Sequence, residues 1–103
     1  MTTKHLEVHV TADSEEEAEK IVKAAVESRN AAGAQISGPV RSTYWWKGKI
    51  ERNEEFLILL KTTPAKLDDL VATIKAAHSY ETPEIVALPI LGGLGDYLEW
   101  ITA

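Results

Sequence analysis

The chain has 103 residues and no cysteine, with a formal net charge of −5, 45% hydrophobic residues and 26% charged residues. This length and balance predict one globular domain over residues 1–103. The absence of cysteine excludes disulfides, thiolate metal sites and cysteine nucleophiles. The acidic balance argues against a general nucleic-acid binder.

Targeting and membrane signals are not visible in the sequence. No stretch approaches the roughly 20 apolar residues that a membrane span needs. The N-terminal sequence MTTKHLEVHV lacks the apolar core of a signal peptide. We therefore expect a cytoplasmic protein that interacts with neither membranes nor nucleic acid.

The chain begins with a predicted strand and a predicted helix. Residues 5–11 alternate apolar and polar side chains, which is typical of a half-buried strand. Residues 13–30 then place apolar side chains at helical spacing. Ser14, followed three positions later by Glu17, has the pattern of a capping box and predicts the start of this helix.

A long hairpin is predicted next. A strand over residues 30–46 is interrupted at Gly38-Pro39, which indicates a bulge or a sheet edge. Residues 47–49 read Lys-Gly-Lys and predict a short turn, in which the glycine can take a positive φ. Residues 50–63 return as the partner strand.

The second half repeats the pattern. Thr63 and Pro64 predict the cap and first position of a helix over residues 63–80. Residues 82–91 predict a fourth strand, which ends at the glycines of GGLG, and residues 96–103 predict a short terminal helix or an edge segment. The order β-α-β-β-α-β predicts an α+β, ferredoxin-like sandwich with both helices on one face of the sheet.

Several strands predict that a single subunit is incomplete. The stretches FLILL (56–60) and IVALPIL (85–91) do not alternate, although a strand with one wet face should. The hairpin arms of about 12 residues would span roughly 40 Å at ~3.4 Å per residue, so that the tip with Trp45 and Trp46 protrudes. A closed homo-oligomer would cover these surfaces, with the aromatic residues as anchors. The alternative is that the tryptophan pair packs into its own subunit.

His78 is the most informative titratable residue. It continues the apolar stripe of the second helix four positions after Ile74. Tyr80, Glu81 and Glu84 follow closely, and together with the imidazole they could bind a divalent cation or a polar ligand. A packing role without a ligand is the alternative for this histidine.

Other candidate sites are weaker. His5, Glu7 and His9 share one strand face, but the two histidines would lie about 13 Å apart and cannot share one ion. Lys61 precedes the second helix and could form an anion pocket, or simply extend into solvent. The residues 41–52 carry a local charge of +4 − 1 = +3. No pattern pairs a nucleophile with a base, so we expect a protein that is not an enzyme.

Four stretches together resemble the CutA family, the divalent-cation-tolerance proteins. They are STYWWKGKIE, LLKTT, HSYETPEIVALPI and DYLEWI, in the order and spacing of that family. The resemblance runs from Ala31 to Ile101. It implies a ferredoxin-like fold assembled as a homotrimer, in which the long hairpins extend the sheets of neighbouring subunits. Trp45 and Trp46 would then be buried at subunit contacts.

The resemblance also implies a ligand site. The family is similar to the trimeric PII signalling proteins, which bind effectors in clefts between subunits. The corresponding cleft would be lined by Tyr44, Trp45, Lys61, His78, Tyr80 and Glu81.

The function implied by the family is tolerance of copper and other divalent cations. His78 and Glu81 are the predicted metal ligands, for Cu(II) or another divalent cation, with no obligatory cofactor. Many relatives carry a cysteine where this chain has Gly33, so a site here must use nitrogen and oxygen ligands, which suit Cu(II) better than Cu(I). Two alternatives remain open: a PII-like module that binds an anionic metabolite, and a purely structural or interaction trimer.

Overall fold

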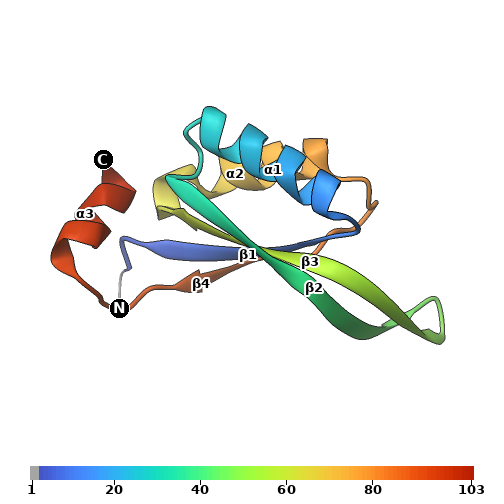
Figure 1. Ribbon diagram of the computed structural model, residues 1–103. Coiled ribbons are helices and arrows are strands. Elements are labelled where there is room, and N and C mark those ends of the chain that lie inside the picture. Colours follow the sequence, from blue (N-terminus) through green and yellow to red (C-terminus); the bar gives the residue numbers. More distant parts are fainter. Residues whose placement is uncertain (1–2) are drawn as a thin grey trace.

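The structure, a computed structural model, describes residues 3–103. A four-stranded antiparallel sheet and three α-helices form an α+β fold with extents of 43 × 28 × 22 Å (Figure 1). In chain order, the elements are β1 (Leu6–Ala12), α1 (Glu15–Glu27), β2 (Gly33–Trp46), β3 (Lys49–Thr62), a 3₁₀ turn (Pro64–Lys66), α2 (Leu67–Ala77), β4 (Ile85–Pro89) and α3 (Gly95–Thr102).

The sheet has the strand order β2-β3-β1-β4. Strand β1 lies in the middle and pairs antiparallel with β3 on one side and β4 on the other. Helices α1 and α2 lie side by side on one face of the sheet, as Figure 1 shows. The predicted order of elements and their two-layer arrangement are confirmed.

The hydrophobic core lies between this face and the two helices. Alternate residues of β1 and β3 point into it, which the alternating pattern of residues 5–11 predicted for the first strand. The largest fully buried apolar side chains are Val8, Val10, Ile21, Ile58, Leu60, Leu70 and Ile74.

The two helix starts differ from each other. Ser14 Oγ accepts a hydrogen bond from the Glu17 N–H, so the predicted cap of α1 is confirmed. The predicted cap of the second helix is wrong in detail. Thr63 makes no side-chain cap bond, and a 3₁₀ turn intervenes before α2 begins at Leu67. Helix α2 also ends at Ala77 rather than continuing to residue 80.

The β2–β3 hairpin extends well beyond the helices and twists away from the rest of the sheet (Figure 1). Its turn has positive φ at both central residues, 50° at Lys47 and 79° at Gly48, which matches the right-handed twist of the strands. The register shifts between Ser37 and Val40, at the predicted bulge. The prediction of a protruding hairpin is therefore confirmed.

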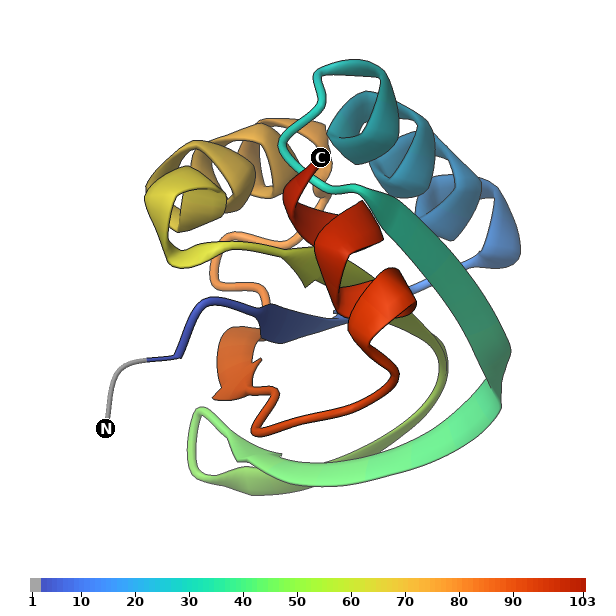
Figure 2. The same ribbon diagram turned by 90° about the vertical axis from the view of Figure 1, so that its left-hand side faces the viewer.

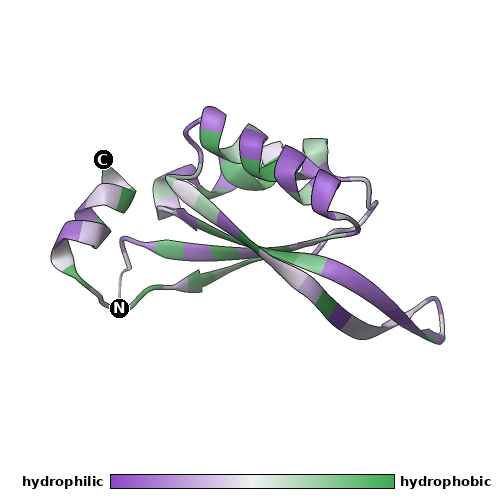
Figure 3. Cartoon of the chain, viewed as in Figure 1, coloured by the Kyte–Doolittle hydropathy of each residue, from purple (hydrophilic) through white to green (hydrophobic). Residues whose placement is uncertain are grey.

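The second face of the sheet carries no helix (Figure 1), and the strands of the sheet carry many hydrophobic residues (Figure 3). Val86 and Leu88 are 47% and 41% exposed, and by strand alternation they share this face with the half-buried Leu57 and Leu59. The non-alternating strands thus leave apolar surface open in a single subunit.

Helix α3 lies across one end of the sheet, near the start of β2 (Figure 2). The Trp100 ring packs so closely on Gly33 that a Cβ at position 33 would lie 2.8 Å from it. Any larger residue here would require the Trp100 ring to shift. Within the described residues, no helix is long and apolar enough to cross a membrane.

Candidate functional site

A pocket of about 570 Å³ lies where the hairpin leaves the sheet. The hairpin lines one side of the pocket, the loop of residues 78–84 lines the other side, and the end of β1 lies between them. The lining residues are Thr11, Asp13, Ser42, Thr43, Tyr44, Trp46, Asn53, Glu55, Tyr80, Glu81, Thr82 and Glu84. Four of them are carboxylates, and none is lysine, arginine or histidine.

The strand register explains how the hairpin lines this pocket. Ser42 lies opposite Asn53, and Tyr44 lies opposite Glu51, so Ser42, Tyr44 and Trp46 share one face of β2 with Asn53 on β3. Glu55 lies two residues before Leu57 on the same face of β3. The Asn53 side chain donates a hydrogen bond to the Tyr44 hydroxyl, which fixes the phenol ring at the pocket wall.

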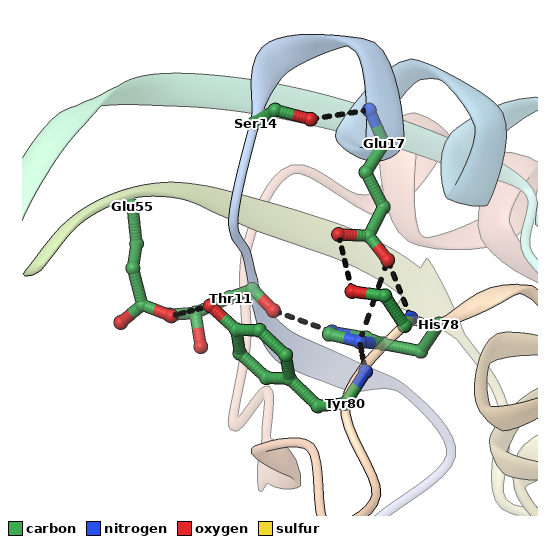
Figure 4. A network of polar contacts seen from close by, with 7 residues as sticks. Thr11, Ser14, Glu17, Glu55, His78 and Tyr80 are labelled. Carbon is green, nitrogen blue, oxygen red and sulfur yellow. Dashed lines mark hydrogen bonds and ion pairs between the residues drawn. The ribbon is translucent and has the colours of Figure 1, made fainter.

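Glu55 and Tyr80 form the floor of the pocket. Glu55 is only 4% exposed, and its Oε2 accepts a hydrogen bond of 2.8 Å from the Tyr80 hydroxyl (Figure 4). Burial, together with this hydrogen bond to the Glu55 carboxylate and its charge, raises the pKa of Tyr80 well above its ordinary value. Tyr80 therefore stays protonated and donates to Glu55 at any physiological pH.

His78 lies directly beneath this floor, with a side chain that is 0% exposed. Its Nε2 is 2.7 Å from the Thr11 carbonyl oxygen, and its Nδ1 accepts a 3.1 Å hydrogen bond from the Tyr80 N–H (Figure 4). This pair of partners fits the neutral imidazole with the proton on Nε2. Both ring nitrogens are therefore occupied by the backbone.

Helix α1 holds the same loop from the other side. The Glu17 carboxylate accepts hydrogen bonds from both the N–H and the hydroxyl of Ser79 (Figure 4). Burial acts to raise the pKa of Glu17, but the side-chain and backbone hydrogen bonds from Ser79 outweigh it and lower the pKa. The loop that carries Tyr80 and Glu81 is thus fixed by β1 and α1 together.

The structure brings only half of the predicted cleft residues together. Tyr44, Tyr80 and Glu81 line the pocket. His78 supports the pocket from below without lining it. The metal site at His78 and Glu81 stays a prediction, and it would require the imidazole to release one of its two hydrogen bonds.

The other predicted cleft residues, Trp45 and Lys61, lie elsewhere. Trp45 is on the opposite face of the hairpin and is 72% exposed, so its own subunit does not cover it. Lys61 Nζ lies 2.9 Å from a carboxylate oxygen of Glu7 on the open sheet face.

Glu7 forms a small polar cluster at that place. It accepts from both His9 Nε2, at 2.8 Å, and Lys61. The hydrogen bond with His9 and then that with Lys61 lower the pKa of Glu7. Among residues 3–103, no group of three histidine, aspartate or glutamate side chains could hold a metal ion. The cluster around Glu7 is therefore not such a group.

The sequence reasoning missed Asp13, Asn53 and Glu55. Asp13 lies in the β1–α1 connection and Glu55 immediately precedes the apolar run 56–60, so each resembled an ordinary surface residue. The hairpin register, counted back from the turn at Gly48, would have placed Asn53 and Glu55 on the face of Tyr44. Nothing local to position 13 or 55 indicates that the loop 78–84 folds over it.

Known proteins are similar to this chain over nearly its whole length. Residues 6–103 match the family model described as CutA1 divalent ion tolerance protein. The divalent-cation tolerance protein CutA of Archaeoglobus fulgidus is 44% identical over 97 residues, which covers 94% of each chain. The chloroplastic protein CutA 1 of rice, Oryza sativa subsp. japonica, is 37% identical, and the match covers 97% of this chain but 56% of that longer protein.

Solved structures have the same fold. The divalent cation tolerance protein (Cut A1) of Thermus thermophilus superposes with a TM-score of 0.92 at 43% identity, covering 94% of both chains. The structure of the A. fulgidus protein, described as periplasmic, superposes with a TM-score of 0.91 and covers 95% of both. The fold, the matched length and the level of identity agree, and the chain therefore belongs to the CutA1 divalent ion tolerance protein family.

Proposed function

We propose that this protein is a cytoplasmic homotrimer that takes part in the response to divalent metal ions, copper among them, and that it captures a cation or small ligand in the acidic pocket at a subunit boundary. The observation that carries the proposal is the charge of the pocket. Asp13, Glu55, Glu81 and Glu84 line one cavity without a basic side chain among its lining residues. Such a cavity attracts cations and repels anions.

The ligand chemistry favours oxygen donors. Glu81 lines the pocket, whereas His78 has both nitrogens bonded to the backbone. No ready-made group of three ligands exists among residues 3–103, so a divalent ion here would keep several water ligands or take a ligand from a neighbouring subunit. Cu(II) accepts such oxygen ligands, while Cu(I), which prefers sulfur, does not fit.

The trimer proposal rests on the surface that one subunit leaves open. The uncovered sheet face carries Val86 and Leu88, and the hairpin tip carries Trp45, all at least 41% exposed. Apolar surface of this kind marks a protein interface. Since Glu55 shares its face of β3 with Leu57 and Leu59, the pocket lies at the rim of that surface.

We assign no catalysis and no obligatory cofactor to the chain, because no pattern in the sequence pairs a nucleophile with a base. The PII-like alternative, an anionic metabolite bound at Lys61, is less favoured. Lys61 is paired with Glu7 and lies outside a pocket lined by four carboxylates. The alternative of a purely structural trimer predicts that the pocket binds nothing.

Calorimetric titration tests the proposal. Cu(II), Mn(II) and ATP are titrated into the wild type, into Glu81→Gln, and into Glu54→Gln as a control on the hairpin that does not line the pocket. We expect at least one metal ion to bind, about tenfold more weakly to Glu81→Gln and equally well to Glu54→Gln. Binding of ATP alone would favour the anionic alternative, and no binding by any titrant would favour the structural one.

A further inference from the structure

The floor of the pocket holds a buried carboxylate that lacks a cation. Glu55 is 4% exposed, and within residues 3–103 its carboxylate has one hydrogen-bond donor, the Tyr80 hydroxyl on Oε2. No lysine, arginine or histidine of the described chain forms an ion pair with it. Its second oxygen, Oε1, has no donor among these residues and is accessible to solvent, since the described residues include no buried side-chain oxygen or nitrogen without a partner. Glu55 is one of the residues that line the pocket. A buried charge of this kind is unfavourable unless a partner compensates it.

The size of the pocket points to an organic partner for this charge. A volume of about 570 Å³ is that of a small-molecule site, which typically measures about 300–1,000 Å³. A metal ion held by this chain alone would need three or more ligands converging within a few ångströms, and the described residues offer no such group. The carboxylates are instead distributed around a cavity that a short molecule would fill.

Aromatic side chains in the pocket are a second feature, beside the carboxylates, that suits an ammonium ligand. Tyr44, Trp46 and Tyr80 line the cavity together with the carboxylates. Aromatic faces attract ammonium groups through their quadrupole, and such rings also pack against methylene groups. Trp46 already has an ammonium over its ring within the chain, since Lys47 Nζ lies 5.8 Å from the ring centroid.

From these observations we propose that the pocket binds a small organic ammonium compound, with one ammonium group on the free oxygen of Glu55 and its aliphatic part beside Tyr44 and Trp46. Glu81 and Glu84 at the loop wall suit a second ammonium group, so an aliphatic diamine is the simplest ligand of this class. The inference rests on the proposed function, in that the same pocket takes a cation, and it names the chemical class of that cation.

The test uses three five-carbon probes of similar length and different charge. The probes 1,5-diaminopentane, glutarate and 1-pentanol are titrated calorimetrically into the full chain. The variants are Glu55→Gln, which keeps the size and the acceptor for Tyr80, and Glu54→Gln, its neighbour on the opposite face of β3. We expect only the diamine to bind, about 10- to 100-fold more weakly to Glu55→Gln and within twofold of the wild type for Glu54→Gln.

Each outcome decides the inference. Absence of diamine binding, equal binding of glutarate, or an equal loss in both variants overturns it. A parallel titration with Mn(II) and Cu(II) separates it from the proposed function. If a metal ion binds in a way that depends on Glu81 and the diamine does not bind, the proposed cation pocket stands and the proposal of an organic ammonium ligand is wrong. Diamine binding without metal binding supports the organic ligand and removes the divalent ion from the proposal.

Discussion

The His78 side chain forms hydrogen bonds with two backbone groups. Its ring lies 4.6 Å from the Tyr80 ring, centroid to centroid, and its two nitrogens join the end of β1 to the loop 78–84. Pairing between β4 and β1 ends at Val10, and the imidazole binds the carbonyl oxygen of the next residue, Thr11. The side chain therefore completes hydrogen bonding where the ladder stops.

Replacement of His78 should therefore weaken folding. We expect His78→Ala to lower the free energy of unfolding by about 2–4 kcal/mol, because it leaves a cavity and two buried backbone groups without partners. His78→Asn should cost less, since its side-chain oxygen can still accept from the Tyr80 N–H. Urea unfolding measures both. A stable His78→Asn variant that has lost Cu(II) binding would instead assign the residue as a metal ligand.

Replacement of Glu55 by glutamine should stabilise the fold, in contrast to the replacement of His78. In the absence of ligand, we expect Glu55→Gln to raise the free energy of unfolding by about 1 kcal/mol, because the amide removes a buried charge and keeps the acceptor for Tyr80. Thermal unfolding of the wild type and the variant measures this difference, with Glu54→Gln as the exposed control. A marked loss of stability in Glu55→Gln would show that the carboxylate stabilises the fold itself and is not a free binding group for a cation.

Strands β1 and β3 are held together by an ion pair as well as by their backbone hydrogen bonds. Glu7 on β1 binds His9 on the same strand and Lys61 on β3, and these bonds lower its pKa from 4.5. A carboxylate with a lower pKa in the folded chain stabilises it above the unfolded pKa, and the contribution disappears as the pH falls through the folded value.

Stability should accordingly fall as the pH drops below about 4.5, and Glu7 should account for part of the loss. We expect the difference in unfolding free energy between pH 6 and pH 3 to be smaller in Glu7→Gln than in the wild type. The matched control is Glu19→Gln, an exposed carboxylate on α1. Identical pH dependence in the wild type and Glu7→Gln would show that the β1–β3 ion pair does not contribute.

The elements were also the level at which sequence reasoning succeeded most. The Ser14 cap, the Gly48 turn and the bulge before Val40 depend on a few neighbouring residues, so local patterns predicted them. The pocket depends on contacts such as Glu55 with Tyr80, which are 25 residues apart in the chain. No local pattern determines whether a loop folds over a strand, and Glu55 was missed for that reason.

His78 illustrates the same limit. Its place on the buried side of the helix was predicted from spacing, but its partners come from Thr11 and from the loop that follows it. Of the residues predicted for the cleft, Trp45 belongs to the other face of the hairpin, because side chains alternate along a strand. Lys61 shares the face of Glu55 but lies six residues further along β3, where it pairs with Glu7. A family pattern gives the positions of such residues without the faces on which they lie.

For the whole molecule, the uncovered sheet face and the exposed hairpin tip indicate an assembly. We expect the wild type to have the mass of a trimer, 3 × 11.3 = 33.9 kDa, by light scattering. Val86→Lys should reduce that mass, because a charge would be buried at the interface. Val26→Lys on α1, where the valine is 37% exposed, is the control and should leave it unchanged. If Val86→Lys and Val26→Lys change the mass to the same extent, this sheet face is not an interface.

The proposed metal site at a subunit boundary is tested most directly by anomalous scattering from crystals of the full chain, soaked separately in Mn(II) and in Cu(II). This measurement locates the ion and the subunit boundary in one experiment. We expect a peak in the pocket beside Glu55 and Glu81, with a neighbouring subunit at its rim. Peaks confined to His5 or His9, or a pocket remote from every other subunit, would contradict the proposal.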